Sequence, residues 1–91
     1  MKKSKRFFIT GSVQPLFFNK FVKDNADKLG IKGFLRNLED GRIEIFVEGN
    51  TDNVESMSQI CRRGSEHSQI RNVEEKDEKF QDFKDFKVLR F

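Results

Sequence analysis

The chain has 91 residues, with 18 lysine and arginine residues against 15 aspartate and glutamate residues and a formal net charge of +3. At this length only one small hydrophobic core can form, so we expect a single domain over residues 1–91 without a large ligand cavity. One cysteine cannot form an intramolecular disulfide, and no apolar run reaches the roughly 18 residues that a spanning helix needs. The apolar stretch after Arg6 is too short for a signal peptide, so we expect a cytoplasmic protein without a membrane partner.

The first half of the chain predicts a strand, a helix and a hairpin. Alternating apolar residues indicate a strand over residues 5–13, which Pro15 ends because proline lacks a backbone N–H. A helical stripe follows and ends at Gly30; it consists of Phe18, Val22, Ala26 and Leu29. Asp40-Gly41 lies between two β-prone runs, 31–38 and 42–48, which is a hairpin signal.

The second half predicts another helix and further strands. The polar residues of the stretch 49–52 offer N-terminal caps for a helix that ends near Arg63, with Val54, Met57 and Cys61 as its apolar stripe. Residues 68–75 indicate a weak strand, and the charged stretch 74–79 reads as a solvated loop, a frayed strand end or a partner surface. Residues 86–88 indicate a terminal strand.

The predicted order is strand, helix, strand, strand, helix, strand. This is the pattern of the α+β class with a ferredoxin-like βαββαβ sandwich, in which a four- to five-stranded, mostly antiparallel sheet carries two helices on one face. Because charged edge strands discourage pairing with a second copy, we expect a monomer. The fold hosts many unrelated functions, so function must come from particular residues.

Several kinds of chemistry are disfavoured by the residues present. Cys61 lies on the apolar stripe of the second helix, which favours core packing over a nucleophilic role. His67 has no clustered ligand beside it, which favours a solvated loop histidine over a metal ligand. Glu44 and Glu48 flank Phe46 on the strand that would stack RNA bases, and their charges would repel phosphate, so we expect no nucleic-acid partner.

The stretch Gly11–Asn19 runs from the first strand through a short loop into the first helix. A helix N-terminus presents backbone N–H groups that have no helical acceptor, and these can hold a phosphate. The stretch is therefore either an anion-binding site or an ordinary connection between a strand and a helix.

The residues of this stretch resemble the acylphosphatase signature G-x-V-Q-G-V-x-F-R at Gly11, Val13, Gln14 and Phe18. Residues 33–37, Gly-Phe-Leu-Arg-Asn, are similar to the family's second motif G-[WF]-V-x-N, and the hairpin over 40–42 continues the likeness. The resemblance implies a ferredoxin-like fold that hydrolyses the carboxyl–phosphate bond of a small acyl phosphate without a metal, a cofactor or a covalent intermediate.

The resemblance also implies roles for individual residues. Asn37 stands where the family's asparagine orients the attacking water, whereas Asn19 stands where the family's arginine grips the phosphoryl oxygens. Lys20 follows it as a partial substitute that lacks the planar fork of arginine. The phosphate-binding loop would consist of Gln14, Pro15, Leu16, Phe17 and Phe18.

The sequence departs from the family pattern at two of these positions, because Asn19 replaces the arginine and Pro15 replaces the middle glycine. Proline removes one N–H donor from the loop and fixes its φ angle. Two hypotheses follow. The protein is an acylphosphatase whose turnover is weak or lost, or it is a non-catalytic module of the same fold that binds an anion or a protein.

Overall fold

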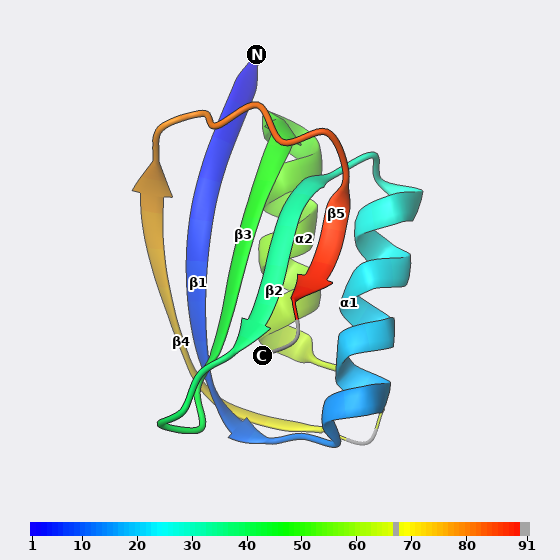
Figure 1. Ribbon diagram of the computed structural model, residues 1–91, viewed down its shortest axis with the longest axis vertical. Coiled ribbons are helices and arrows are strands. Elements are labelled where there is room, and N and C mark those ends of the chain that lie inside the picture. The colour runs from blue at the N-terminus through cyan, green and yellow to red at the C-terminus, as the bar shows by residue number, and fades with distance from the viewer. Residues whose placement is uncertain (67, 90–91) are drawn as a thin grey trace.

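The computed structural model describes residues 1–66 and 68–89, which form a five-stranded sheet with two helices on one face (Figure 1). The elements in chain order are β1 (Lys2–Ser12), α1 (Pro15–Lys28), β2 (Lys32–Asn37), β3 (Ile43–Asn50), α2 (Thr51–Arg63), β4 (Gln69–Glu78) and β5 (Phe86–Leu89). The strand order is β4-β1-β3-β2-β5; the β2–β5 pair is parallel and the other pairs are antiparallel. The predicted ferredoxin-like α+β fold is confirmed, with β5 as a fifth strand.

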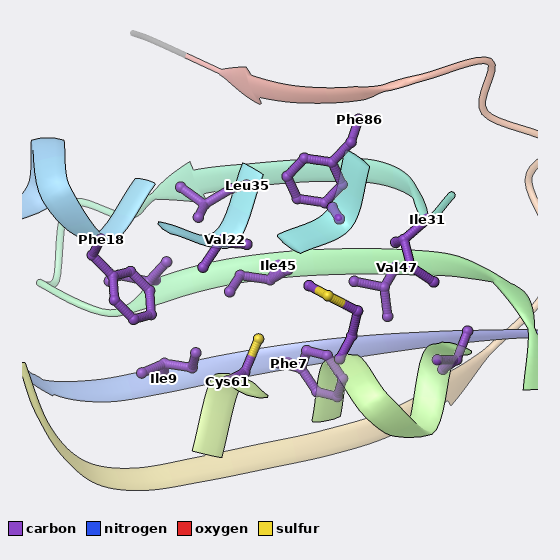
Figure 2. Packing of buried hydrophobic residues seen from close by; sticks show 14 residues of the cluster. Phe7, Ile9, Phe18, Val22, Ile31, Leu35, Ile45, Val47, Cys61 and Phe86 are labelled. Carbon is purple, nitrogen blue, oxygen red and sulfur yellow. The ribbon is translucent and has the colours of Figure 1, made fainter. Parts of the chain in front are cut away.

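The hydrophobic core lies between the sheet and the two helices (Figure 2). Side chains with almost no exposed surface come from both helices and from β1, β2, β3 and β5; they include Phe7, Ile9, Phe18, Val22, Ala26, Leu35, Ile45, Val47, Met57 and Phe86. The helical stripes predicted from the sequence therefore face the core. Leu29 is less buried than the other residues of its stripe, because it lies at the C-terminal end of α1.

Two glycines in the β2–β3 hairpin adopt conformations that other residues rarely take. Gly41, in the turn, has a φ of +91°. Gly33, at the start of β2, has a φ of +140°, and a Cβ placed on it would lie 1.9 Å from the carbonyl oxygen of Phe46. Close approach of the β3 backbone therefore requires glycine at position 33.

The N-terminus of α2 differs from the prediction of a local cap. Its N-cap residue, Asn50, makes no side-chain capping hydrogen bond. Instead the N–H and Oγ1 of Thr51 donate to the carbonyl oxygen of Met1, at 2.9 and 3.0 Å. The antiparallel pairing of Lys2 with Asn50 brings this distant carbonyl to the helix. The prediction of local capping was wrong because the acceptor lies 50 residues away in the sequence.

The charged stretch after residue 73 is also different from the prediction. Glu74 to Glu78 continue β4 as a regular strand that pairs with β1, with Ser4 opposite Glu78 and Phe8 opposite Glu74. The prediction of a solvated loop or frayed end was wrong, because β1 is long enough to pair with this segment and its basic side chains reach diagonally to the acidic ones. Lys5 pairs with Glu75 at 3.0 Å, and Arg6 pairs with Glu78 at 3.3 Å.

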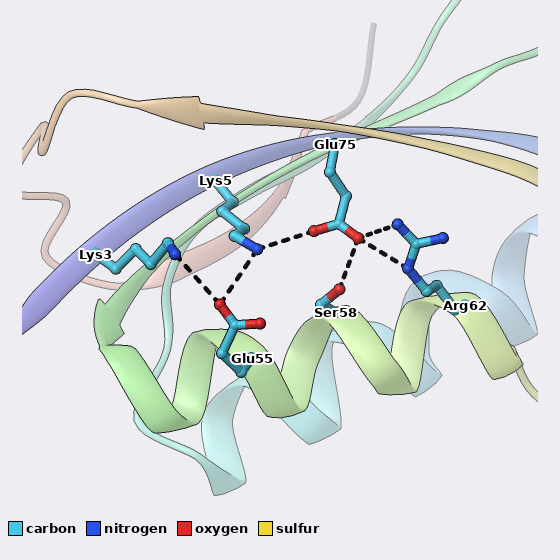
Figure 3. A network of polar contacts seen from close by, with 6 residues as sticks. All are labelled: Lys3, Lys5, Glu55, Ser58, Arg62 and Glu75. Carbon is cyan, nitrogen blue, oxygen red and sulfur yellow. Dashed lines mark hydrogen bonds and ion pairs between the residues drawn. The ribbon is translucent and has the colours of Figure 1, made fainter.

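Glu75 is the centre of a polar network between β4, β1 and α2 (Figure 3). It accepts hydrogen bonds from Lys5 Nζ, Ser58 Oγ and Arg62 Nε, at 3.0, 2.9 and 2.8 Å. Burial of the carboxyl group acts to raise its pKa, but these hydrogen bonds outweigh burial and lower the pKa from 4.5 to about 2. The network therefore attaches β4 to α2 only while Glu75 is ionised.

We expect Glu75→Gln to lower the free energy of unfolding by about 1–3 kcal/mol at pH 7. Because the pKa is lower in the folded state, the stabilisation by ionised Glu75 is complete above about pH 4.5 and is lost as the pH falls towards 2. Urea unfolding between pH 7 and pH 2.5 should show a shallower pH dependence for the variant than for the wild type. Glu74→Gln, an exposed carboxylate on the same strand, is the control, and equal slopes for all three proteins would contradict the assignment.

The sheet face opposite the helices carries the two acidic residues of β3. Glu44 pairs with Arg6 and Arg36, and it is almost fully buried. Glu48 accepts a hydrogen bond from Ser4 Oγ at 3.1 Å and two more from the backbone N–H groups of Gln81 and Phe83. Glu48 therefore attaches the connection between β4 and β5 to the sheet.

Candidate active site

The β1–α1 junction forms a short turn. Gln14 is the N-cap residue of α1, with φ of −87° and ψ of 110°, and Pro15 occupies the first helical position, which proline favours. The first helical hydrogen bond runs from the N–H of Phe18 to the carbonyl oxygen of Gln14, at 2.8 Å. The amide of Leu16 precedes this bond, so helix geometry gives it no helical acceptor, and Pro15 has no N–H to offer.

The electrostatics of this turn suit an anion. The amide dipoles of a helix give its N-terminus a partial positive charge. The first turn of α1 contains no acidic residue, so no carboxylate of that turn already neutralises this charge. Proline at position 15 leaves the dipole in place but removes one of the donors that glycine would supply. The turn can therefore attract an oxyanion while offering it one hydrogen bond fewer.

Phe18 belongs to the hydrophobic core and not to the surface of the proposed phosphate site. Its side chain is completely buried, and its N–H is used in the first hydrogen bond of α1. Neither group is therefore available to a phosphate, although the resemblance had placed Phe18 in the phosphate-binding loop. Figure 2 shows its ring among the core side chains, where it fixes the first turn of α1 against the sheet. Leu16 and Phe17, by contrast, are 73% and 65% exposed.

Asn19 and Lys20 lie beside a pocket between α1 and β5. The pocket has a volume of about 650 Å³ and is lined by Leu16, Asn19, Lys20 and Lys23 of α1 and by residues 85–88. Asn19 Oδ1 is buried and has no hydrogen-bond partner among the described residues. Lys20 is exposed and pairs with Asp24 at 2.9 Å, one turn further along the helix. Lys20 is therefore directed along the helix surface to a carboxylate.

Asn37 is the last residue of β2 and is exposed. Both Asn37 and Ile9 pair with Ile43 of β3, so two strand spacings, about 10 Å, separate their Cα atoms. Side chains alternate along a strand, so Asn37 shares the face of Leu35, which packs beneath the helices. Asn37 therefore lies at the same end of the sheet as the β1–α1 junction, where β1 and β2 both end (Figure 1). It does not line the α1–β5 pocket.

Two further residues were considered for catalysis or metal binding, Cys61 and His67. Cys61 is completely buried, and burial raises the pKa of its thiol to about 12, so it is not a nucleophile at neutral pH. The core position predicted for Cys61 is confirmed (Figure 2). His67 lies outside the described residues. Within residues 1–66 and 68–89, no three acidic, histidine or cysteine side chains are grouped to hold a metal ion.

Sequence reasoning missed the β5 side of the pocket. Phe86 and Val88 belong to β5, whose parallel partner β2 lies about 50 residues earlier in the chain. No local pattern indicates that this strand lies beside the first turns of α1. In the part of the chain that the structure describes, neither helix is long and apolar enough to cross a membrane.

Comparisons with known proteins identify the family and agree with the fold. A family model described as acylphosphatase matches residues 5–88. A protein named acylphosphatase from Alkalilimnicola ehrlichii is 38% identical over 74 residues, which are 81% of this chain and 83% of that protein. An acylphosphatase from Syntrophobacter fumaroxidans is 40% identical over 73 residues, covering 80% of this chain and 75% of that protein.

A solved structure gives the same result at the level of the fold. The crystal structure of acylphosphatase from Bacillus subtilis superposes with a TM-score of 0.90 at 27% identity, and the match covers 99% of this chain and 100% of that chain. Taken with the family model and the two relatives, this shows that the chain belongs to the acylphosphatase family.

Proposed function

We propose that the protein binds a small acyl phosphate at the N-terminus of α1 and hydrolyses its carboxyl–phosphate bond slowly. One observation supports this most: Asn37 and the first turn of α1 lie at the same end of the sheet, on the same side. In this arrangement the amide of Leu16 and the helix dipole hold the phosphoryl oxygens, and Asn37 orients a water molecule.

The reaction needs few protein groups. The oxygen of the water attacks phosphorus, the bond between phosphorus and the acyl oxygen breaks, and a carboxylate leaves with the bonding electrons. The water's proton passes to the phosphate or to solvent, so the products are inorganic phosphate and a carboxylate. A carboxylate leaves without protonation, so positioning and charge stabilisation supply the rate enhancement. Gln14, Leu16 and Phe17 frame the anion, whereas Lys20 adds little charge while it pairs with Asp24.

The same site has a second candidate function. Asn19 and Pro15 remove a guanidinium and a backbone donor from the phosphate site, and these two changes favour a module that binds an anion or a protein without hydrolysing a substrate. Both functions require that the site binds an anion. They differ in whether the site also orients a water molecule for hydrolysis.

We expect purified wild-type protein to hydrolyse benzoyl phosphate, and Asn37→Ala to lower kcat/KM at least about 100-fold because the water loses its orientation. Asn53→Ala on α2 is the matched control, since it removes the same group away from the β1–α1 junction. If the folded wild type binds inorganic phosphate but hydrolyses no acyl phosphate, the proposed hydrolase function is overturned and the anion-binding function remains. Equal activity of Asn37→Ala and the wild type would remove Asn37 from the mechanism.

We also propose that residues 1–91 act as one acylphosphatase unit, cytoplasmic and monomeric, without nucleic-acid or membrane partners. The ion pairs of Glu44 with Arg6 and Arg36 support this, because they occupy the basic groups that RNA phosphates would need on the open sheet face. The charged residues of β4 disfavour pairing at that edge. A dimer in sedimentation velocity at micromolar concentration would contradict the monomer.

A further inference from the structure

The pocket between α1 and β5 begins where the phosphate site is proposed. Leu16 belongs to both, because its amide lies in the first turn of α1 and its side chain lines the pocket. From Leu16 to Lys23 the pocket follows α1 over seven residues, about 10 Å along the helix axis. A group attached to a phosphate at the helix N-terminus can therefore extend directly into the pocket.

The pocket has an apolar part beside its charged residues. Leu16 is 73% exposed, and Phe86 and Val88 of β5 lie on the opposite side. The aliphatic stems of Lys20 and Lys23 add further apolar surface. A single exposed leucine is common on proteins, but this one continues an apolar wall into a concave site.

The charges around the pocket compensate one another. Lys20 pairs with Asp24 at 2.9 Å and Lys23 pairs with Asp27 at 2.7 Å, so each lysine already has a carboxylate partner. Asp85 and Lys87 add one charge of each sign on the β5 side. An acyl group that carries its own negative charge would therefore find no free cation on α1. An uncharged acyl group needs no such partner.

We propose that this pocket binds the acyl group of the substrate and selects acyl phosphates with an uncharged, apolar acyl group, such as an aromatic ring or a medium-length alkyl chain. This inference rests on the proposed function, because it requires the phosphate to lie at the N-terminus of α1. Leu16 is the specificity-determining residue, and Val88 is the apolar side chain on the opposite wall, in front of the buried Phe86.

Binding of acylphosphonates tests the inference without turnover, since these compounds keep the acyl group but lack the scissile oxygen. We expect benzoylphosphonate to bind at least about tenfold more tightly than acetylphosphonate in titration calorimetry, because its ring buries apolar surface in the pocket. Succinylphosphonate, which carries a carboxylate, should bind no better than acetylphosphonate. In Leu16→Ser the tenfold preference should fall to about threefold or less.

The matched control is Phe80→Ser, which removes a 44% exposed aromatic ring that lines neither the junction nor the pocket and should keep the preference. Inorganic phosphate serves as the probe for the anion site alone. If phosphate binds but benzoyl- and acetylphosphonate bind equally, the acyl pocket is overturned and the phosphate site remains. If neither phosphate nor any phosphonate binds, the proposed function falls, and the acyl pocket with it.

Two further results would also overturn the inference. One is a preference that survives Leu16→Ser but disappears in Phe17→Ser, which would place the acyl group on the other side of the helix, outside the pocket. The other is succinylphosphonate binding more tightly than benzoylphosphonate, which would assign the pocket to a charged acyl group.

Discussion

Asn19→Arg should raise kcat/KM for benzoyl phosphate by on the order of 10²–10⁵, the range by which a guanidinium on transferring phosphoryl oxygens changes rates. Position 19 lies in the first turns of α1 beside the proposed phosphate site, and an arginine there has the length and the planar fork to bind two phosphoryl oxygens. The change also removes a buried carbonyl oxygen that has no partner among the described residues. Pro15→Gly in the same chain should add a further increase by restoring an N–H donor.

The control for added charge is Gln59→Arg, an exposed position on α2 that should leave the rate unchanged. Asn19→Lys separates charge from geometry, because lysine adds a point charge without the fork. The rate of phosphate release at steady state is measured for the wild type and the four variants. If neither Asn19→Arg nor the double variant gains activity while both remain folded, more than these two positions has diverged from the active enzymes.

Phe18→Ala should cost about 3–5 kcal/mol of unfolding free energy, because it leaves a cavity in a completely buried site. Against the 5–15 kcal/mol typical of small domains, this loss is large enough to populate unfolded protein near 37 °C. Guanidinium unfolding at 25 °C measures the change through the midpoint and the m-value.

Phe17→Ala is the matched control, since it truncates the same side chain one residue earlier, where the ring is 65% exposed. We expect its loss to stay within about 1 kcal/mol. Similar losses for the two variants would contradict the placement of Phe18 in the core and of Phe17 at the surface.

Local patterns were enough to predict most of the fold. The stripe of Phe18, Val22 and Ala26 has a period that only a helix with one buried face satisfies, and all three are completely buried. Asp40-Gly41 indicated the hairpin because the turn needs positive φ, which Gly41 adopts. The extension of β4 and the cap of α2 could not be predicted, since the first depends on β1 and the second on the carbonyl of Met1, both distant in the sequence.

The candidate site was predictable to a different extent. The junction at Gln14 could be predicted from local signals, because a strand end and a helix start mark it, whereas Asn37 was identified only through the resemblance to the acylphosphatase motifs. The burial of Phe18 conflicts with its inclusion in the loop, and the helical stripe already contained that information. The pocket wall from Phe86 and Val88 had no local signal, because the parallel pairing of β5 with β2 depends on the tertiary fold.

The strand order has a consequence for the order of synthesis. Both outer strands of the sheet, β4 and β5, come from the last part of the chain, and they flank β1 and β2 on opposite sides. When Arg63 has left the ribosome, α1, α2 and the inner strands are complete, but both edges of the three-stranded sheet still have unpaired backbone groups. The nascent chain is therefore most prone to association with other chains while residues 64–89 are being synthesised, and the two edges are covered only when β4 and β5 emerge.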